Sequence, residues 1–321
     1  MFKYYILTSN SLATLARQFD TLKINDVVVV INTLDADYEQ SAIEFCVKHG
    51  IEHYVTESDG TAATGKNSVL KLFLESDNEY FVHVDGDDII TKYGRNLYRT
   101  VAMRPDAPDV ICLYNQLCLH GYRKGLWDDQ YDSRTVKRDG WYIPQDLIPR
   151  YPHDYTMDAK HENLSVETIA AAYMRDFSVS QNTAVRWARK RRELNDIYKD
   201  HCDRQESFSR IVFFSRKAAK LMHYDNTLRI GEDAYQMHQL RKLAHDGVID
   251  MRTRKERWAF TYVQLADRSS ITRNVTSSGD IIINYDWMEP LVDALNKLKP
   301  ELPIDYSLPE FIDPYYEVNQ E

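Results

Sequence analysis

The feature that most constrains the fold is the segment Val27 to Asn32, which reads VVVVIN. An uninterrupted β-branched run of this kind is typical of a strand that is buried on both faces of a parallel sheet. Further strands are expected at 4–8, 51–56 and 80–84, with helices at 37–49 and 67–74. Gly50 is a natural C-terminal cap for the first of these helices. Strands that alternate with helices predict an α/β fold with a mostly parallel sheet flanked by helices.

Polar residues follow each expected strand of this first part of the chain. They are Ser9-Asn10, Asn32-Thr33, Ser58-Asp59 and the acidic cluster Asp85-Gly86-Asp87-Asp88. In open α/β sheets, ligands bind beyond the carboxyl ends of the strands. The sequence therefore predicts a binding site at this edge of the sheet.

Composition limits the class of protein. The chain has 321 residues, of which 43% are hydrophobic and 28% charged, as in ordinary folded proteins. A net charge of −9 argues against nonspecific coating of nucleic acid or of acidic membranes. Four scattered cysteines form no Cys-x-x-Cys pair, which excludes a disulfide framework and a typical structural zinc site. Because no run approaches a membrane span and the start lacks a signal-like segment, we expect a cytoplasmic protein, in the host cytoplasm if a phage encodes it.

The acidic cluster after the fourth strand has the chemistry of a cation site. Carboxylates on a tight turn are the ligands that a hard divalent cation bridging two phosphates requires. Gly86 lets the backbone turn between Asp85 and Asp87 without a side chain in the way. We predict that Asp85 and Asp87 bind Mn²⁺ or Mg²⁺. The alternative is an acidic turn exposed to solvent.

The segment Gly60 to Asn67 nearly matches the phosphate-binding loop G-x-x-x-x-G-K-[ST]. Asn67 stands where that motif has a metal-binding hydroxyl, and the segment would follow a third strand instead of opening the fold. These two departures argue against a nucleoside-triphosphatase or kinase, which is kept as an alternative.

Taken together, Gly65-Lys66-Asn67 and Asp85 to Asp88 resemble the GT-A fold of the family 2 glycosyltransferases. Members of that family also have a later Glu-Asp pair, and Glu232-Asp233 is similar to it. The resemblance covers residues 1 to about 105 and 210 to 250 in the expected order. It implies a metal-dependent enzyme that moves a sugar from a nucleotide diphosphate, UDP by expectation, to a hydroxyl group.

The resemblance also implies roles for individual residues. Asp233, with Glu232 beside it, would be the catalytic base that removes the acceptor proton and inverts the anomeric carbon. The donor would contact the carboxyl edge of the sheet, through Thr8, Ser9, Asn10, Asn32, Asp59, Lys66, Asn67, Asp85 and Gly86.

Two departures from the family pattern matter. The usual Pro-x-Tyr-Asn opening is replaced by ILTSNS, which leaves base recognition undefined. A Gln-x-x-Arg-Trp element, typical of processive synthases, is approximated by Gln181 and Arg186-Trp187. It has the wrong spacing and precedes the Glu-Asp pair, so we do not expect a processive polymerase.

A basic stretch lies in a helix expected from Glu167 to Tyr198. Arg186, Arg189 and Lys190 can share one face because helical neighbours recur at three and four residues. The stretch is either a solvated helix face or a seat for a phosphate-bearing acceptor, and Trp187 would stack on a base or anchor the helix. These features resemble bacteriophage glycosyltransferases that modify hydroxymethylated pyrimidines in DNA. A cell-surface glycan is the alternative acceptor, and a noncatalytic binding module is the rival class.

The organisation expected from these patterns has four parts. A nucleotide-sugar half covers residues 1–120, and an acceptor half with the Glu-Asp pair covers 206–299. Between them, 121–205 forms a largely helical insertion that starts with a long loop, and 300–321 forms a tail.

Overall fold

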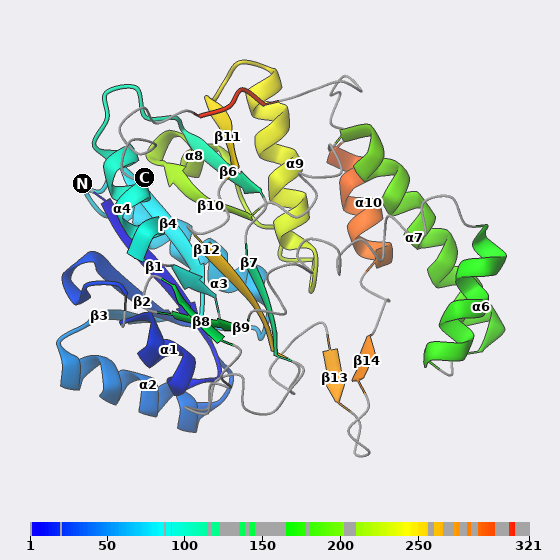
Figure 1. Cartoon of the computed structure of the whole chain (residues 1–321), viewed down its shortest axis with the longest axis horizontal. Coiled ribbons are helices and arrows are strands. Elements are labelled where there is room, and N and C mark those ends of the chain that lie inside the picture. Colours follow the sequence, from blue (N-terminus) through cyan, green and yellow to red (C-terminus); the bar gives the residue numbers. More distant parts are fainter. Residues whose placement is uncertain are drawn as a thin grey trace.

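The computed structural model describes the chain in segments, which are 2–19, 21–86, 88–90, 92–114, 117–121, 135–138, 141–144, 165–177, 180–201, 210–255, 260–265, 273–275, 281–283, 288–298 and 308–311. A central sheet of seven strands forms the body of the molecule (Figure 1). Its strands, in the order in which they lie across the sheet, are β11 (Met251–Lys255), β6 (Val110–Tyr114), β10 (Arg210–Ser215), β4 (Tyr80–Asp85), β1 (Phe2–Thr8), β2 (Val27–Ile31) and β3 (Glu52–Val55). The α/β class with a mostly parallel sheet is confirmed.

Only β10 runs against its neighbours among the strands of this sheet. It is antiparallel to β4 and β6, whereas the other neighbouring pairs are parallel. The chain adds β2 and β3 on one side of β1 and then returns to place β4 on the other side. The sheet therefore has a topological switch point between β1 and β4, where ligands typically bind.

Helices cover both faces of the sheet because the strand residues are apolar on both sides. All five residues of β2 are buried, as its VVVVI sequence predicts. One face packs on helices α1 (Leu12–Gln18), α2 (Ala36–His49) and α4 (Lys92–Ala102). The other face packs on α3 (Ala62–Glu75), α8 (Arg216–Leu221) and α9 (Glu232–His245).

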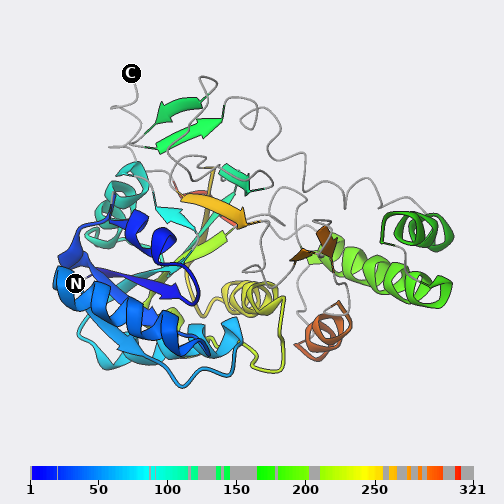
Figure 2. The same cartoon turned by 90° about the horizontal axis from the view of Figure 1, so that it is seen from below.

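A separate helical unit lies to one side of the sheet in both views (Figures 1 and 2). It contains α6 (Val166–Phe177), α7 (Gln181–His201) and α10 (Met288–Leu298), which share an apolar cluster. The single helix expected from 167 to 198 is wrong, because two helices occupy that stretch. Ser180 begins the second one, since its side chain accepts a hydrogen bond from the Thr183 amide at 3.3 Å.

Smaller elements complete the described chain. A 3-10 turn, η1 (Ile24–Asp26), precedes β2. The short strands, in their paired groups, are β5 (Ile89–Ile90) with β12 (Phe260–Leu265) and β7 (Leu117–Gly121), β8 (Thr135–Arg138) with β9 (Trp141–Pro144), and β13 (Arg273–Val275) with β14 (Ile281–Ile283). The pair β8–β9 corrects the expectation of a continuous loop there, and most of the rest of that loop lies outside the described residues. Among the described helices, none combines the length and apolar character needed to cross a bilayer.

Two helix starts differ from expectation in ways that affect the site. Helix α3 begins at Ala62, five residues before the expected start, because the Thr61 side chain accepts a hydrogen bond from the Thr64 amide. Gly65 and Lys66 therefore lie within the helix and not in a loop. The sequence from Ile230 to Asp233 predicts a turn that precedes a helix, whereas α9 begins at Glu232, so Glu232 and Asp233 form its first turn. The end of α2 at the left-handed Gly50 is confirmed.

Candidate active site

The ammonium group of Lys66 brings together three separate motifs of the sequence. Its Nζ atom lies 2.9 Å from Oε1 of Glu232, 2.5 Å from Oδ1 of Asp233 and 3.7 Å from Oδ1 of Asp85. The Lys66 side chain is 2% exposed, so these contacts form inside the protein. The glycine-lysine pair, the acidic turn and the Glu-Asp pair thus form one cluster at the carboxyl edge of the sheet.

Gly65 allows α3 to come this close to the sheet. A Cβ atom at position 65 would lie 2.7 Å from Nδ2 of Asn32 and 2.8 Å from Cδ1 of Leu7, which is closer than side chains pack. The Asn32 side chain is fixed in this position, because its amide nitrogen donates to the Thr61 carbonyl and its amide oxygen accepts from the Thr56 hydroxyl. Glycine at 65 therefore places Lys66 at the ends of β1 and β2.

The acidic turn from Asp85 to Asp88 packs on the end of β1 and accepts hydrogen bonds from the end of α1. A Cβ atom at Gly86 would lie 2.8 Å from the Leu7 carbonyl oxygen, so only glycine lets the turn cross the end of β1. Gln18 donates from its amide to the carbonyls of Gly86 and Asp88. His83 Nε2 lies 2.9 Å from Oδ1 of Asp85 and orients that carboxylate.

Asn67 contacts the protein backbone in the structure. Its amide nitrogen donates to the Tyr224 carbonyl at 2.8 Å, and its amide oxygen accepts from the Tyr224 amide at 2.9 Å. The same nitrogen lies 2.7 Å from Oδ1 of Asn226. The two residues after Gly65 therefore contact both the segment before α9 and the first turn of α9.

Burial and charge act in opposite directions on the ionisation of this cluster. Burial alone would lower the pKa of Lys66, but Asp233, Asp85 and Glu232 outweigh burial and hold the pKa well above its ordinary value. Burial raises the pKa of Glu232, and Lys66 only partly offsets that rise. Asp233 is more open, with 47% of its side chain exposed. Of the two acidic residues in α9, Asp233 is thus the one that solvent and a second substrate can reach.

Of the two residues expected to bind a divalent cation, the structure describes only Asp85. Asp85 is 20% exposed at the mouth of the turn, and carboxylate oxygens are ligands that Mg²⁺ and Mn²⁺ accept. Asp87, the second expected ligand, lies outside the described residues. Within the described part of the chain, no group of three or more His, Cys, Asp or Glu side chains is arranged to hold a metal ion. The metal site stays a prediction.

The other expected donor-binding residues line the same edge but differ in exposure. Thr8 is buried and its hydroxyl contacts that of Tyr38, whereas Ser9 and Asn10 are exposed at the bend after β1. The Asp59 carboxylate accepts hydrogen bonds from Thr61 and Thr64, which lower the pKa of Asp59. The Asp59 carboxylate therefore supports Thr61, the capping residue of α3, at the edge of the site.

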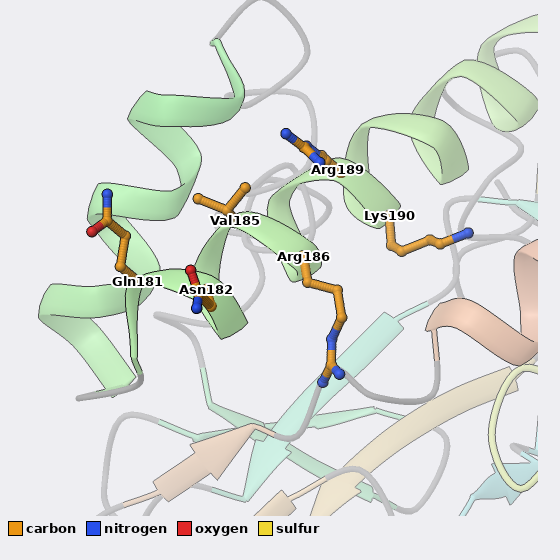
Figure 3. A pocket seen from close by; sticks show the side chains of 6 residues that line it. All are labelled: Gln181, Asn182, Val185, Arg186, Arg189 and Lys190. Carbon is orange, nitrogen blue, oxygen red and sulfur yellow. The ribbon is translucent and has the colours of Figure 1, made fainter.

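The expected acceptor residues lie on α7, away from this cluster. Arg186, Arg189 and Lys190, together with three other residues of the helix, line a hollow of about 500 Å³ (Figure 3). Arg186 pairs with Glu289 of α10 at 3.6 Å, and Lys190 pairs with Glu193 at 3.2 Å. Trp187 is 6% exposed within the apolar cluster of α6, α7 and α10, so it anchors the helix.

Sequence reasoning missed two residues that shape the site. Gln18 supports the acidic turn, and the ring of Tyr224 lies 5.5 Å from the Lys66 ammonium. Neither carries a motif, and each becomes relevant only when distant segments pack together. Burial raises the pKa of the Tyr224 phenol, so it stays neutral beside the carboxylates.

No known protein family matches the chain, and no curated protein matches its sequence. Its structure is similar to that of S. aureus TarS residues 1–349 in complex with UDP-GlcNAc, with a TM-score of 0.48, 11% identity, and coverage of 94% of this chain and 68% of that one. For the longer TarS chain the TM-score is 0.43 with 13% identity, and the match covers 82% of this chain and 37% of TarS. The mannosyltransferase PcManGT from Pyrobaculum calidifontis, in complex with GDP-Man and Mn²⁺, gives 0.41 and 13%, with coverage of 92% and 69%. Similarity at this level assigns neither a family nor an activity.

Proposed function

We propose that the chain is a glycosyltransferase that moves a sugar from a nucleotide diphosphate to a hydroxyl acceptor. The observation that carries the proposal is the cluster of Asp85, Lys66, Glu232 and Asp233 beside the switch point of the sheet. Asp85 is expected to contact the donor, and Glu232 and Asp233 are expected to act on the acceptor. All three contact the Lys66 ammonium. A donor bound over the acidic turn would therefore lie next to the exposed base.

In the proposed reaction, Asp233 accepts the proton of the acceptor hydroxyl. The hydroxyl oxygen then forms a bond to the anomeric carbon, and the bond from that carbon to the diphosphate breaks, with its electron pair leaving on the nucleoside diphosphate. Asp233 is suited to this role because its side chain is half-exposed at the start of α9, where an acceptor hydroxyl can approach it. Attack opposite the leaving group would invert the anomeric carbon.

Asp85, together with Asp87, would hold a divalent cation near the diphosphate. When bound, Mn²⁺ or Mg²⁺ would neutralise the charge that develops on the leaving group. Asp85, which is 20% exposed at the end of β4, would supply a carboxylate oxygen to such a cation.

The nucleoside-triphosphatase alternative loses its main support in the structure. A phosphate-binding lysine must direct its ammonium at the ligand, whereas Lys66 directs its ammonium at Glu232 and Asp233. The Gly60 to Asn67 segment is also mostly helical.

We further propose that the hollow over α7 receives an anionic acceptor, with hydroxymethylated DNA as the candidate. Arg189 is exposed there, and Arg186 and Lys190, each paired with a neighbouring glutamate, would share their charge with an anionic acceptor. Each phosphate contact should contribute about 0.9 to the log–log slope of binding against salt. The double substitution Arg189→Ala with Lys190→Ala should flatten that slope by roughly one to two. The exposed pair Lys217 and Lys220 on α8, replaced by alanine, is the matched control.

The test of the proposed function starts from a panel of UDP and GDP sugars with Mn²⁺. Bound donor should raise the unfolding temperature, because a ligand that binds only the folded state stabilises it. The donor that binds is then incubated with hydroxymethylcytosine DNA, unmodified DNA and oligosaccharides, and products are detected by mass. Sugar on oligosaccharide alone would reject the DNA acceptor and keep the glycosyltransferase. No binding and no transfer with any donor would reject the proposed function.

A further inference from the structure

The Lys66 ammonium is already committed to carboxylates of the protein. An ammonium has three hydrogens to donate, and two of them go to Glu232 and Asp233. The third partner within ion-pair distance is Asp85, at 3.7 Å. Two of its three hydrogens are thus used inside the protein, and the Lys66 side chain is only 2% exposed, which leaves little access for a donor phosphate.

Asn67 extends the same connection along the chain. Its side chain binds both the amide and the carbonyl of Tyr224, in the segment that leads into α9. The Tyr224 ring in turn lies 5.5 Å from the Lys66 ammonium. Two adjacent residues of α3 therefore hold the backbone before α9 and the acidic side chains of its first turn.

The elements joined in this way are far apart in sequence. Lys66 is 166 residues from Glu232 and 167 from Asp233. Residues 62–85 supply α3, β4 and Asp85, whereas Asp233 belongs to the later half of the chain. The Lys66 contacts therefore link the helix that carries Asp233 to the part of the chain that carries Asp85.

We propose that Lys66 and Asn67 are positioning residues that fix Asp233 relative to Asp85, instead of binding the donor as the motif resemblance implies. The identity of the reaction rests on the proposed function, but the positioning itself does not. Packing alone does not explain the arrangement, because a buried ion pair usually stabilises a fold no better than apolar side chains of similar volume. Gly65 supports the inference, since it brings Lys66 into reach of α9.

The kinetic test removes the ammonium without leaving a buried carboxylate unpaired. The variant Lys66→Met combined with Glu232→Gln is compared with Glu232→Gln alone, so that the difference reports on Lys66. We expect kcat to fall by about 10²-fold, as for a misplaced catalytic group, while the donor Kd changes by less than about threefold. Lys66→Arg should recover part of kcat because it keeps a cation between the same carboxylates. Lys71→Met, on the exposed face of α3, should leave both constants unchanged.

The opposite pattern would overturn the inference. If the donor Kd weakened by about 10²-fold and kcat for bound substrate were unchanged, Lys66 would bind the donor directly. Unchanged kcat and unchanged donor Kd would equally reject a positioning role.

A second measurement keeps the inference testable even if the proposed function fails. Hydrogen exchange of the amides in residues 235–239, the first that can form hydrogen bonds within α9, is compared in the wild type, in Asn67→Ala and in Lys66→Met with Glu232→Gln. Positioning by Lys66 and Asn67 predicts exchange about tenfold faster in both variants, because local opening of α9 becomes easier. Equal exchange in all three proteins would overturn the inference. Absence of sugar transfer by the wild type would reject only the proposed function.

Discussion

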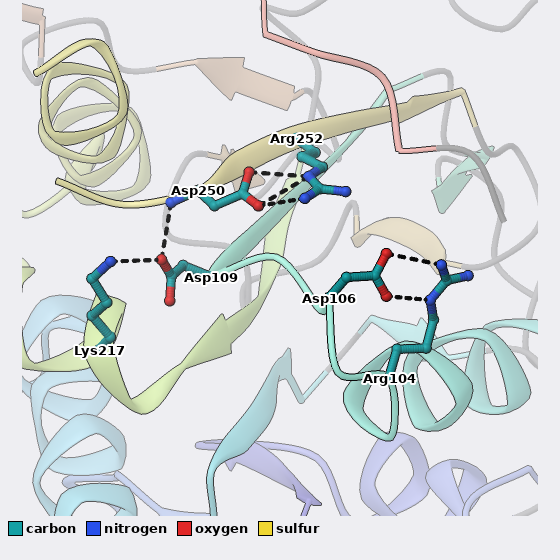
Figure 4. Close-up of polar contacts among 6 residues, drawn as sticks. All are labelled: Arg104, Asp106, Asp109, Lys217, Asp250 and Arg252. Carbon is teal, nitrogen blue, oxygen red and sulfur yellow. Dashed lines mark hydrogen bonds and ion pairs between the residues drawn. The ribbon is translucent and has the colours of Figure 1, made fainter. Parts of the chain in front are cut away.

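Charged clusters lie at both ends of the parallel strands, which are called the carboxyl edge and the amino edge of the sheet. The two clusters differ in burial and in how their basic and acidic residues are paired. At the carboxyl edge, one buried ammonium contacts three carboxylates from distant segments. At the amino edge, basic and acidic residues occur in equal numbers and in pairs (Figure 4). These residues are Arg104, Asp106, Asp109, Lys217, Asp250 and Arg252.

The amino-edge pairs behave like ordinary surface electrostatics. Arg252 pairs with Asp250 and Arg104 with Asp106, each two residues apart. Lys217 is 58% exposed where it contacts Asp109 at 3.3 Å. Asp109 also accepts hydrogen bonds from Ser215 and from the Asp250 amide, so it joins β6, β10 and β11. A network of this kind, in which each pair has one exposed member, supports the sheet, whereas carboxylates from distant segments around one buried ammonium indicate chemistry.

The largest difference between the edges should appear in turnover. Asp233→Asn keeps the shape of the side chain but removes its proton affinity, so kcat for sugar transfer should fall by roughly 10²–10⁴-fold. Asp250→Asn makes the same chemical change at the amino edge and should leave kcat within about twofold, because Asp250 lies at the opposite edge from the proposed base. Steady-state kinetics with saturating donor measure both. Equal effects of the two substitutions would remove the functional distinction between the edges.

The second largest effect is expected in the free energy of unfolding, which should depend strongly on Lys66 and weakly on Lys217. Lys66→Met leaves Glu232 buried beside two other carboxylates, which should lower the free energy of unfolding by about 3–5 kcal/mol. Urea denaturation followed by circular dichroism measures the change. A loss below about 1 kcal/mol would show that Glu232 does not need the ammonium, for instance because it is protonated in the variant.

A smaller loss is expected where α3 packs on the sheet. Gly65→Ala is compatible with a helix, but the added Cβ would lie 2.7 Å from Asn32 and 2.8 Å from Leu7. Moving α3 outward should reduce the free energy of unfolding by about 1–3 kcal/mol and should also reduce kcat. Lys71→Ala on the same helix is the control. Increased stability with unchanged kcat would contradict the close packing described here.

The smallest effect is expected at the exposed amino-edge pair. Lys217→Met should cost about 0–1 kcal/mol, since surface ion pairs contribute little. Any cost should shrink further in high salt, because exposed charges are screened. Urea denaturation at two salt concentrations tests this. A large loss in the free energy of unfolding that does not depend on salt would contradict the prediction, because it would show that Lys217 stabilises the fold as strongly as Lys66.

Much of the fold follows from local patterns in the sequence. The apolar run at 27–32 and the alternation around it predict the parallel strands, and Gly50 marks the end of α2 correctly. The placement of Asp85 at a carboxyl edge also follows, because strand β4 ends there. These features depend on periodicity and on capping residues, which short segments already contain.

The contacts that define the site could not be predicted in the same way. Nothing in the GKN segment indicates that Lys66 faces Glu232, since that contact depends on how α9 packs on α3. The break between α6 and α7 was also missed, because the helical periodicity continues across it and only Ser180 signals a new start. Motifs therefore located the edge of the sheet, whereas tertiary packing decided which side chains meet there.

The most direct test of the account is to find which edge binds nucleotide. Hydrogen exchange would be followed with Mn²⁺ alone, then with UDP and with GDP added separately. We predict that one nucleotide slows exchange at 8–10, at 85–88 and in the first turn of α9, and leaves residues 104–109 and 250–252 unchanged. Protection confined to the amino edge, or no protection with either nucleotide, would contradict the assignment of the active site to the carboxyl edge.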